Sequence, residues 1–323
     1  MSAHKLHRLH EHIQHDPSGD GVDRRGFLEC MAWAGTGLLW TVSAGVLSSS
    51  RLALAGEAPP AGSFHFAQIS DSHIGFAAGA NRDVTATLQL ALARVKALQP
   101  TPAFILHTGD LTHGQKAAEF DTLEGTLQGA GIGQVFYVPG EHDVFADAGK
   151  EYLARHGKGT QGGGWQSFDY QGVHFIGLVN VLNLKPGGLG ALGEEQLAWL
   201  EKDVAGLTSS TPIVVFAHIP LWAVYPSWGW GTDDGERALG YLRRFGSVTV
   251  LNGHIHQVLQ KVEGTVTFHT AMSTAFPQPA PGTAPAPGPM TVPADRLPQL
   301  LGIRDVNFVQ GAGTLAVVDS TLA

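Results

Sequence analysis

The chain has 323 residues, of which 43% are hydrophobic and 15% are charged, and its formal net charge is -8 at pH 7. This composition is typical of folded globular proteins and excludes a mainly disordered chain. The excess of acidic residues argues against binding to a nucleic-acid polymer, which needs a basic face. A small anionic substrate stays open, because bound metal ions can supply positive charge locally.

Residues 1–55 have the pattern of an export signal. Arg24-Arg25 precedes an uncharged run from Cys30 to about Leu47, and Ala53-Leu54-Ala55 is a small-residue cleavage site. The arginine pair resembles a twin-arginine signal, which implies the twin-arginine export machinery as a partner and a periplasmic or secreted protein. An uncleaved membrane anchor is the alternative, because the run is nearly long enough to span a bilayer. Its glycines and the cleavage site favour removal, so we expect no stable membrane anchor.

Strand-like and helix-like segments alternate through residues 64–323, after a linker at residues 56–63. This alternation predicts a single α/β domain with layered, mixed sheets. Residues 277–293 contain seven prolines, and we expect them to form a surface loop rather than core. The predicted strands are 64–69, 103–106, 135–138, 165–170, 173–178, 213–216, 248–251, 261–270 and 314–319, and the predicted helices are 84–98, 116–128, 193–207 and 236–245.

Polar side chains follow five of the predicted strands at the point where each strand ends. In open α/β sheets, sites form outside the carboxyl ends of the strands, so we expect these groups to meet. Two residues at i and i+2 on extended backbone project to the same side, which predicts that Asp71 converges with His73 and His254 with His256. The five groups are Asp71-Ser72-His73, His107-Thr108-Gly109-Asp110, Gly140-Glu141-His142-Asp143, Ala217-His218 and Gly253-His254-Ile255-His256.

In this order, the five groups resemble the calcineurin-like metallophosphoesterase family, whose blocks run D-x-H, G-D, G-N-H-D/E, H and G-H-x-H. The resemblance covers residues 64–270, and segments 71–75 and 109–112 are most similar to the cyclic-nucleotide phosphodiesterase-like branch. It implies a four-layer αββα sandwich. Purple acid phosphatases carry a metal-binding tyrosine three residues after the G-D aspartate, where this chain has His113, and this difference argues against that branch.

The resemblance also implies a dinuclear centre held by carboxylates and histidines. Mixed nitrogen and oxygen ligands suit Mn, Fe or Zn better than Ca or Mg. Mapped by motif, the first ion is held by Asp71, His73, Asp110 and His256, and the second shares Asp110 and is completed by Glu141, His218 and His254.

The implied activity is hydrolysis of a small phosphoester by a metal-bound hydroxide, with a phosphodiester as the main substrate class and monoesters left open. His142 is expected to assist the leaving group, and Asp143 to orient its ring. His113 is a candidate for substrate contact, with a polar residue of a surface loop as the alternative. Trp222 and Trp228 are candidates for a wall around the leaving group, or else they pack their loop onto the domain.

Glu141 stands where the family has asparagine. A carboxylate in place of an amide adds a full negative charge, which should bind metal more tightly and dampen its Lewis acidity. Two outcomes stay open: Glu141 ligates and favours a higher-charge ion such as Fe(III), or it swings away as an acid or base. The alternative function is therefore a non-hydrolytic protein that binds metal or a phosphoester, quenched by Glu141.

Overall fold

The computed structural model describes residues 38–43, 46–51, 60–131, 133–311 and 315–323, in two units that divide after Ala58. In the first unit, β1 (Leu38–Ser43) pairs antiparallel with β2 (Val46–Arg51). The rest of the expected signal segment and residues 56–59 of the expected linker lie outside the described residues, so the export signal stays a prediction. Within the described ranges, the chain has no helix of the length and apolar character that a membrane span requires.

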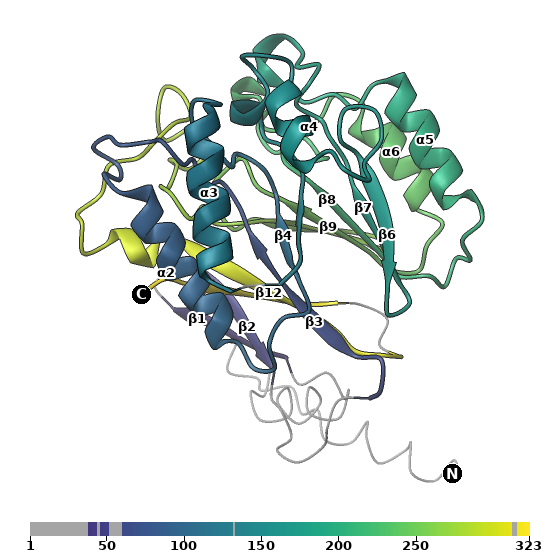
Figure 1. The fold of residues 1–323 in the computed structure, drawn as a ribbon. Helices are drawn as coiled ribbons and strands as arrows, with labels where there is room; N and C mark the ends of the chain where they lie inside the picture. Colours follow the sequence, from purple (N-terminus) through teal and green to yellow (C-terminus); the bar gives the residue numbers. More distant parts are fainter. Residues whose placement is uncertain (1–37, 44–45, 52–59, 132, 312–314) are drawn as a thin grey trace, which may run out of the picture. The chain divides into compact units, whose positions relative to one another are not determined.

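The second unit contains two mixed sheets (Figure 1). The first sheet has the order β13-β12-β3-β4-β5, in which β3, β4 and β5 run parallel and β12 pairs antiparallel with both of its neighbours. Its strands are β3 (Phe64–Ile69), β4 (Ile105–His107), β5 (Val135–Tyr137), β12 (Gly302–Phe308) and β13 (Ala316–Thr321).

The second sheet has the order β10-β11-β9-β8-β7-β6. Its central strands β7, β8, β9 and β11 are parallel, and β6 and β10 are added antiparallel at the edges. The parallel strands are apolar along most of their length, as expected for strands covered on both faces. The strands are β6 (Gln166–Tyr170), β7 (Val173–Gly177), β8 (Ile213–Ala217), β9 (Val248–Asn252), β10 (Gln260–Glu263) and β11 (Val266–Thr270).

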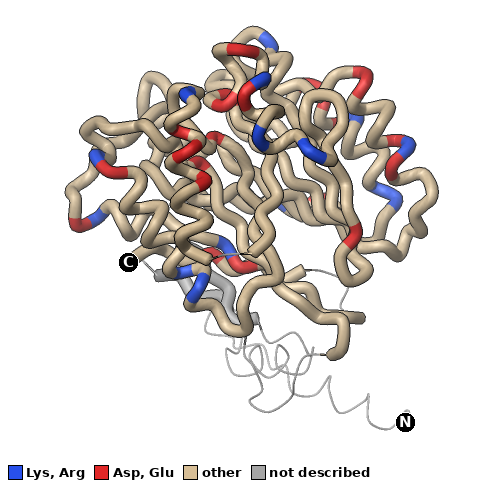
Figure 2. Tube along the Cα trace, viewed as in Figure 1, with Lys and Arg blue, Asp and Glu red and all other residues tan. Residues whose placement is uncertain are grey.

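Helices cover the outer face of each sheet, which confirms the expected αββα sandwich (Figure 1). α2 (Val84–Ala97) and α3 (Ala117–Gly129) share one apolar cluster with β3 and β4. α5 (Glu194–Ala205) and α6 (Gly235–Leu242) share another with β7, β8 and β9. Both signs of charge are spread over the helices and outer loops in the view of Figure 2. A short helix, α4 (Lys150–His156), follows the loop after β5.

The inner faces of the two sheets meet in an aromatic layer. Phe66 and Phe104 stack with their ring centroids 5.1 Å apart, and Phe175 of the other sheet meets Phe66 edge-on at 5.3 Å. Such offset and edge-on contacts stabilise aromatic pairs beyond the area that they bury. This layer holds the sheets face to face, so that the carboxyl ends of β3, β4, β5, β8 and β9 supply loops to one site.

The strands of the second unit differ from the sequence prediction in two places, and α4 was not predicted. Residues 261–270 were expected as one strand but form a hairpin, in which β10 and β11 are joined by a tight turn at Gly264, whose φ of 60° is in the left-handed region. β12 was not predicted, because Arg304 and Asp305 interrupt its apolar pattern.

Arg304 of β12 is fully buried and connects the two sheets. Its Nε and Nη2 atoms donate to both carboxylate oxygens of Asp319, at 2.9 and 3.0 Å. Nη1 donates to Oε1 of Gln68 at 3.1 Å, and Nη2 also donates to the carbonyl of Thr270 in the second sheet at 2.8 Å. These partners match the directions in which a planar guanidinium donates hydrogen bonds, and the ammonium group of a lysine would not reproduce this pattern.

We expect Arg304→Met to destabilise the protein by roughly 3–5 kcal/mol, because it leaves Asp319 buried without a counter-charge. The free energy of unfolding in urea, followed by circular dichroism, measures the loss. Arg243→Met is the matched control, since Arg243 forms its ion pairs with Glu236 and Glu263 at the exposed surface and should contribute much less. Equal effects of the two substitutions would contradict a bridging role for Arg304.

Candidate metal centre

The structure brings together all seven residues that the sequence indicated as metal ligands. Ligand atoms of Asp71, His73 and His256 lie within 4.8 Å of one another, and those of Glu141, His218 and His254 form a second such group. Asp110 joins the two groups, because its Oδ2 atom is 3.4 Å from Nε2 of His73 and 3.5 Å from Nε2 of His218.

The charges of this cluster fit bound cations. Asp71 and Asp110 are buried and Glu141 is about a quarter exposed, yet among the described residues all their ion pairs are with histidines. Buried carboxylates need a compensating positive charge, which bound cations or protonated imidazoles supply. The mixed oxygen and nitrogen donors are the set that transition metals prefer. The residues present therefore fit a dinuclear centre.

Glu141 occupies the place of a ligand in the second group. Its Oε2 atom is 2.9 Å from Nε2 of His218, and its Oε1 atom is 3.0 Å from Nδ1 of His254. Burial alone would raise the pKa of Glu141, but the adjacent His254 and His218 outweigh it and hold this pKa well below its usual range. Glu141 is thus a carboxylate that points into the cluster rather than away from it.

Backbone carbonyls orient the rings of two histidines of the cluster. Nδ1 of His218 donates to the carbonyl of Thr108 at 2.7 Å, and Nδ1 of His256 donates to the carbonyl of Phe276 at 2.6 Å. Because a carbonyl can only accept, Nδ1 carries a proton, and in the neutral ring the lone pair of Nε2 faces the cluster. Such second hydrogen bonds orient metal-binding imidazoles and raise their basicity.

The backbone of the ligand loops is not extended, so the expected reason for the convergence of the i, i+2 pairs was wrong. Five of the seven expected ligands have φ in the left-handed region, with values from 43° to 70°. Residues other than glycine adopt this conformation at a cost of order 1–3 kcal/mol when surrounding contacts enforce it. Here, the amide of His73 donates to the carbonyl of Asp110 and that of Asp71 to the carbonyl of Gly109. The five residues are Asp71, His73, Asp110, His254 and His256.

Two glycines allow the ligand loops to approach one another. At Gly109, φ is 96° and a Cβ atom would lie 2.5 Å from Nδ1 of His218. At Gly140, a Cβ atom would overlap the carboxylate of Asp110. Only a residue without a side chain fits at either position.

Asp143 holds the loop, and it does not orient the ring of His142 as the sequence suggested. Its carboxylate accepts hydrogen bonds from the amides of Leu111, Thr112 and Gly140 at 2.8–3.0 Å, and from the hydroxyl of Thr112 at 2.9 Å. These bonds join the loop after β4 to the short 3₁₀ helix η2 (Glu141–Asp143), which the sequence did not predict. The need to satisfy buried amides explains the position of this carboxylate.

His142 is oriented by the loop that contains His113. Nδ1 of His142 donates to the carbonyl of His113 at 2.8 Å, which leaves Nε2 for a substrate. The two rings stack with centroids 4.7 Å apart, and Nδ1 of His113 is 3.3 Å from Nδ1 of His73. His113 therefore lies in the site and contacts His73, a candidate ligand, while its contact with substrate stays a prediction.

The rings of Trp222 and Trp228 contact aromatic residues outside the cluster of candidate ligands. Trp222 lies 5.0 Å from the ring of Phe268, and Trp228 packs against Tyr225 and Trp230. These contacts match the alternative in which the aromatics pack their own loop. Their role as a wall for the leaving group stays a prediction.

Phe276 and Gln278 support the site and were missed. The ring of Phe276 stacks on that of His73 at 4.7 Å, and the side-chain amide of Gln278 donates to the carbonyl of His254 at 2.9 Å. Phe276 directly precedes the proline-rich segment 277–293 and Gln278 is its second residue, and nine of the 17 residues of this segment are exposed. No motif distinguishes these two residues in the sequence.

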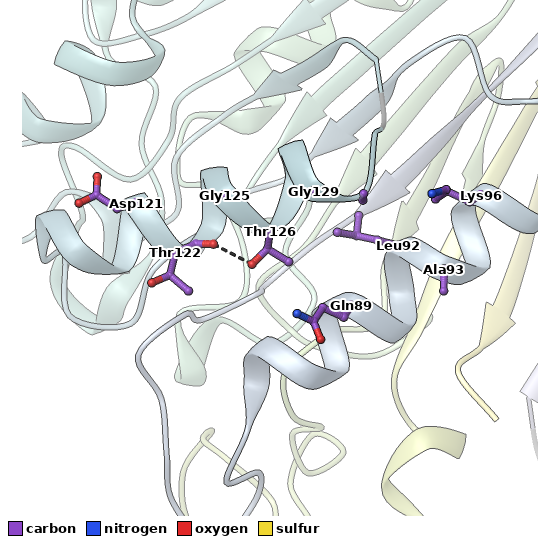
Figure 3. Close-up of a pocket in the computed structure, with 10 residues that line it drawn as sticks. Gln89, Leu92, Ala93, Lys96, Asp121, Thr122, Gly125, Thr126 and Gly129 are labelled. Carbon is purple, nitrogen blue, oxygen red and sulfur yellow. Dashed lines mark hydrogen bonds between the residues drawn. The ribbon is translucent and has the colours of Figure 1, made fainter.

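A groove lies between α2 and α3, apart from the ligand cluster (Figure 3). It has a volume of about 520 Å³ and is floored by small residues of α3, including Gly125 and Gly129. Its lining contains none of the residues of the candidate centre. The lining residues are Gln89, Leu92, Ala93, Lys96, Asp121, Thr122, Gly125, Thr126, Gly129 and Ala130.

We expect Gly140→Ala to weaken metal binding and to destabilise the fold by about 1–3 kcal/mol, because the added methyl group displaces Asp110. Metal content by elemental analysis and the urea midpoint measure the two effects. The matched control is Gly206→Ala, where φ is -84° and the added Cβ meets open space. Full metal content in Gly140→Ala would show that the loops have more room than the structure gives them.

Comparisons with known proteins agree with this geometry. The calcineurin-like phosphoesterase family matches residues 64–258. A protein of Rhodopseudomonas palustris, named as a probable cyclic nucleotide phosphodiesterase, is 25% identical over 223 residues, which cover 63% of this chain and 76% of that protein. A serine/threonine-protein phosphatase of Danio rerio is 28% identical over 226 residues, covering 61% of this chain and 71% of that protein.

The fold is likewise similar to that of a solved relative. A dimetal phosphatase from Danio rerio aligns with a TM-score of 0.57 and 16% identity, over 80% of this chain and 99% of that one. Because the family match spans more than half of the sequence, this chain belongs to the calcineurin-like phosphoesterase family.

Proposed function

We propose that this protein is a dinuclear metal-dependent phosphoesterase that hydrolyses a small phosphodiester. The observation that carries the proposal is the convergence of two groups of ligand atoms on a shared aspartate, Asp110. The similarity to a protein named as a probable cyclic nucleotide phosphodiesterase supports a diester, and the similarity to phosphatases keeps monoesters as a second class.

The roles of the residues follow from their positions. Asp71, His73, Asp110 and His256 would hold one ion, and Asp110, Glu141, His218 and His254 the other. Two ions bound there supply Lewis acidity for the phosphoryl group and an activated water molecule.

His142 acts beside this cluster, with its amide bonded to Oδ1 of Asp110 at 3.0 Å. The carbonyl of His113 holds Nδ1, so Nε2 is the atom that assists the leaving oxygen. Asp143 contributes by keeping η2 and the preceding turn in place.

Glu141 favours a second candidate function. Its carboxylate points at the two histidines of the second group, so the additional negative charge acts where a neutral amide is usual in the family. This charge strengthens cation binding and reduces Lewis acidity. The second candidate function is therefore that of a protein that binds metal or a phosphoester without turnover.

We expect the protein loaded with Mn, Fe or Zn to hydrolyse bis(p-nitrophenyl) phosphate faster than p-nitrophenyl phosphate. His254→Ala should lower this turnover at least 100-fold, with a loss of bound metal seen by elemental analysis. His174→Gln is the control, because His174 is held by Asp169 and Asp203 at the amino end of β7. If the loaded wild type hydrolyses neither ester, the hydrolase proposal is rejected.

We expect Glu141→Asn to lower metal affinity by roughly tenfold or more, because an amide oxygen ligates without charge. Competition with a chelator measures the affinity, and comparison of Fe(III) with Mn(II) shows whether the preference for the higher charge is lost. Turnover measured at saturating metal separates the two functions. Activity that emerges only in the variant would identify the wild type as the quenched binding protein.

A further inference from the structure

Phe145 is an exposed aromatic side chain next to the proposed leaving-group histidine. Its side chain is 64% exposed, and among the described residues only Leu90, Leu184 and Val262 are large apolar residues of comparable exposure. The centroid of its ring is 5.9 Å from that of His142, and the two ring planes are at 89°. The two rings therefore form a right-angled corner.

The loop that carries Phe145 is fixed on both sides. The amide of Phe145 donates to the carbonyl of Glu141 at 3.1 Å, which ties it to η2. The amide of Ala146 donates to Oε1 of Gln115 at 2.6 Å, and Nε2 of Gln115 donates to Asp147. These bonds hold the backbone of the loop in place, while the ring of Phe145 stays uncovered.

The residues around Phe145 leave its ring accessible. Ala146 and Ala148 have no side chain beyond Cβ, and both are exposed. Asp147 turns away to cap α4, where it accepts from the amides of Lys150 and Glu151 at 3.0 and 2.9 Å. An open aromatic ring on a backbone that is held in place offers a planar partner a large contact at modest entropic cost, because only two side-chain torsions need to be ordered.

We propose that Phe145 is a specificity residue that binds a planar aromatic part of the ester's leaving group. This inference rests on the proposed function, because it takes His142 as the residue that faces the leaving oxygen. A group bonded to that oxygen must lie beside His142, and hence within reach of Phe145. A planar ring that stacks on Phe145 lies roughly perpendicular to the ring of His142, since the two side chains are perpendicular.

The test compares the binding of two phosphonates to the metal-loaded protein by calorimetry. Phenylphosphonate and methylphosphonate share the group that meets the metal ions and differ in the group that meets Phe145. We expect Phe145→Ala to lower the ratio of phenyl to methyl affinity about tenfold, Phe145→Leu to lower it similarly, and Phe145→Trp to retain it. Leu90→Ala, which removes an exposed apolar side chain of α2, should leave the ratio unchanged.

The outcomes distinguish this inference from the proposed function. A ratio that is equal in wild type and Phe145→Ala overturns the inference, even if the protein hydrolyses esters. A ratio that falls only in Phe145→Ala, and not in Phe145→Leu, shows a general apolar contact and also overturns it. If the ratio falls as expected but no ester is hydrolysed, the aromatic site stands and the hydrolase proposal fails.

Discussion

Three carboxylates lie close together among histidine side chains, and the rest of the structure depends on this constraint. Asp71, Asp110 and Glu141 lie within 4.0 Å of histidine nitrogens and pair with no lysine or arginine in the described part of the chain. Their mutual repulsion is tolerable only with bound cations or protonated histidines. The left-handed backbone of the ligand residues and the glycines between the loops are local costs of this arrangement. Packing of the aromatic layer between the sheets offsets these costs, and it fixes the strand ends at which the loops begin.

The four-layer architecture and the identity of the candidate ligands were predictable from the sequence. Each candidate ligand follows a strand of one of the two sheets, and residues at the carboxyl ends of such strands meet at one edge whatever the details of the loops. The conformation of the ligand loops was not predictable in this way. His73 and His256 converge through left-handed turns that tertiary hydrogen bonds impose, and a pattern of i, i+2 residues carries no trace of those bonds.

The role of Asp143 was misjudged for a related reason. Because Asp143 directly follows His142, its carboxylate was expected to bind the imidazole ring. Instead, its oxygens accept hydrogen bonds from the buried amides of the turn. Phe145 and Phe276 were missed because aromatic residues in loops have no spacing that separates a site from packing. The export signal and the periplasmic location stay predictions from residues 1–55.

The hydrogen bonds of Arg304 extend well beyond β12. Gln68, which accepts from Arg304, donates to Oγ1 of Thr108 at 3.0 Å, and the carbonyl of Thr108 holds the ring of His218. The carbonyl of Phe276 does the same for His256. The family match ends at residue 258, before both Phe276 and Arg304. The motif-bearing region is therefore not a self-sufficient unit. The described residues after 258 include none of the seven candidate ligands, yet they supply the scaffold against which two of the imidazoles are set.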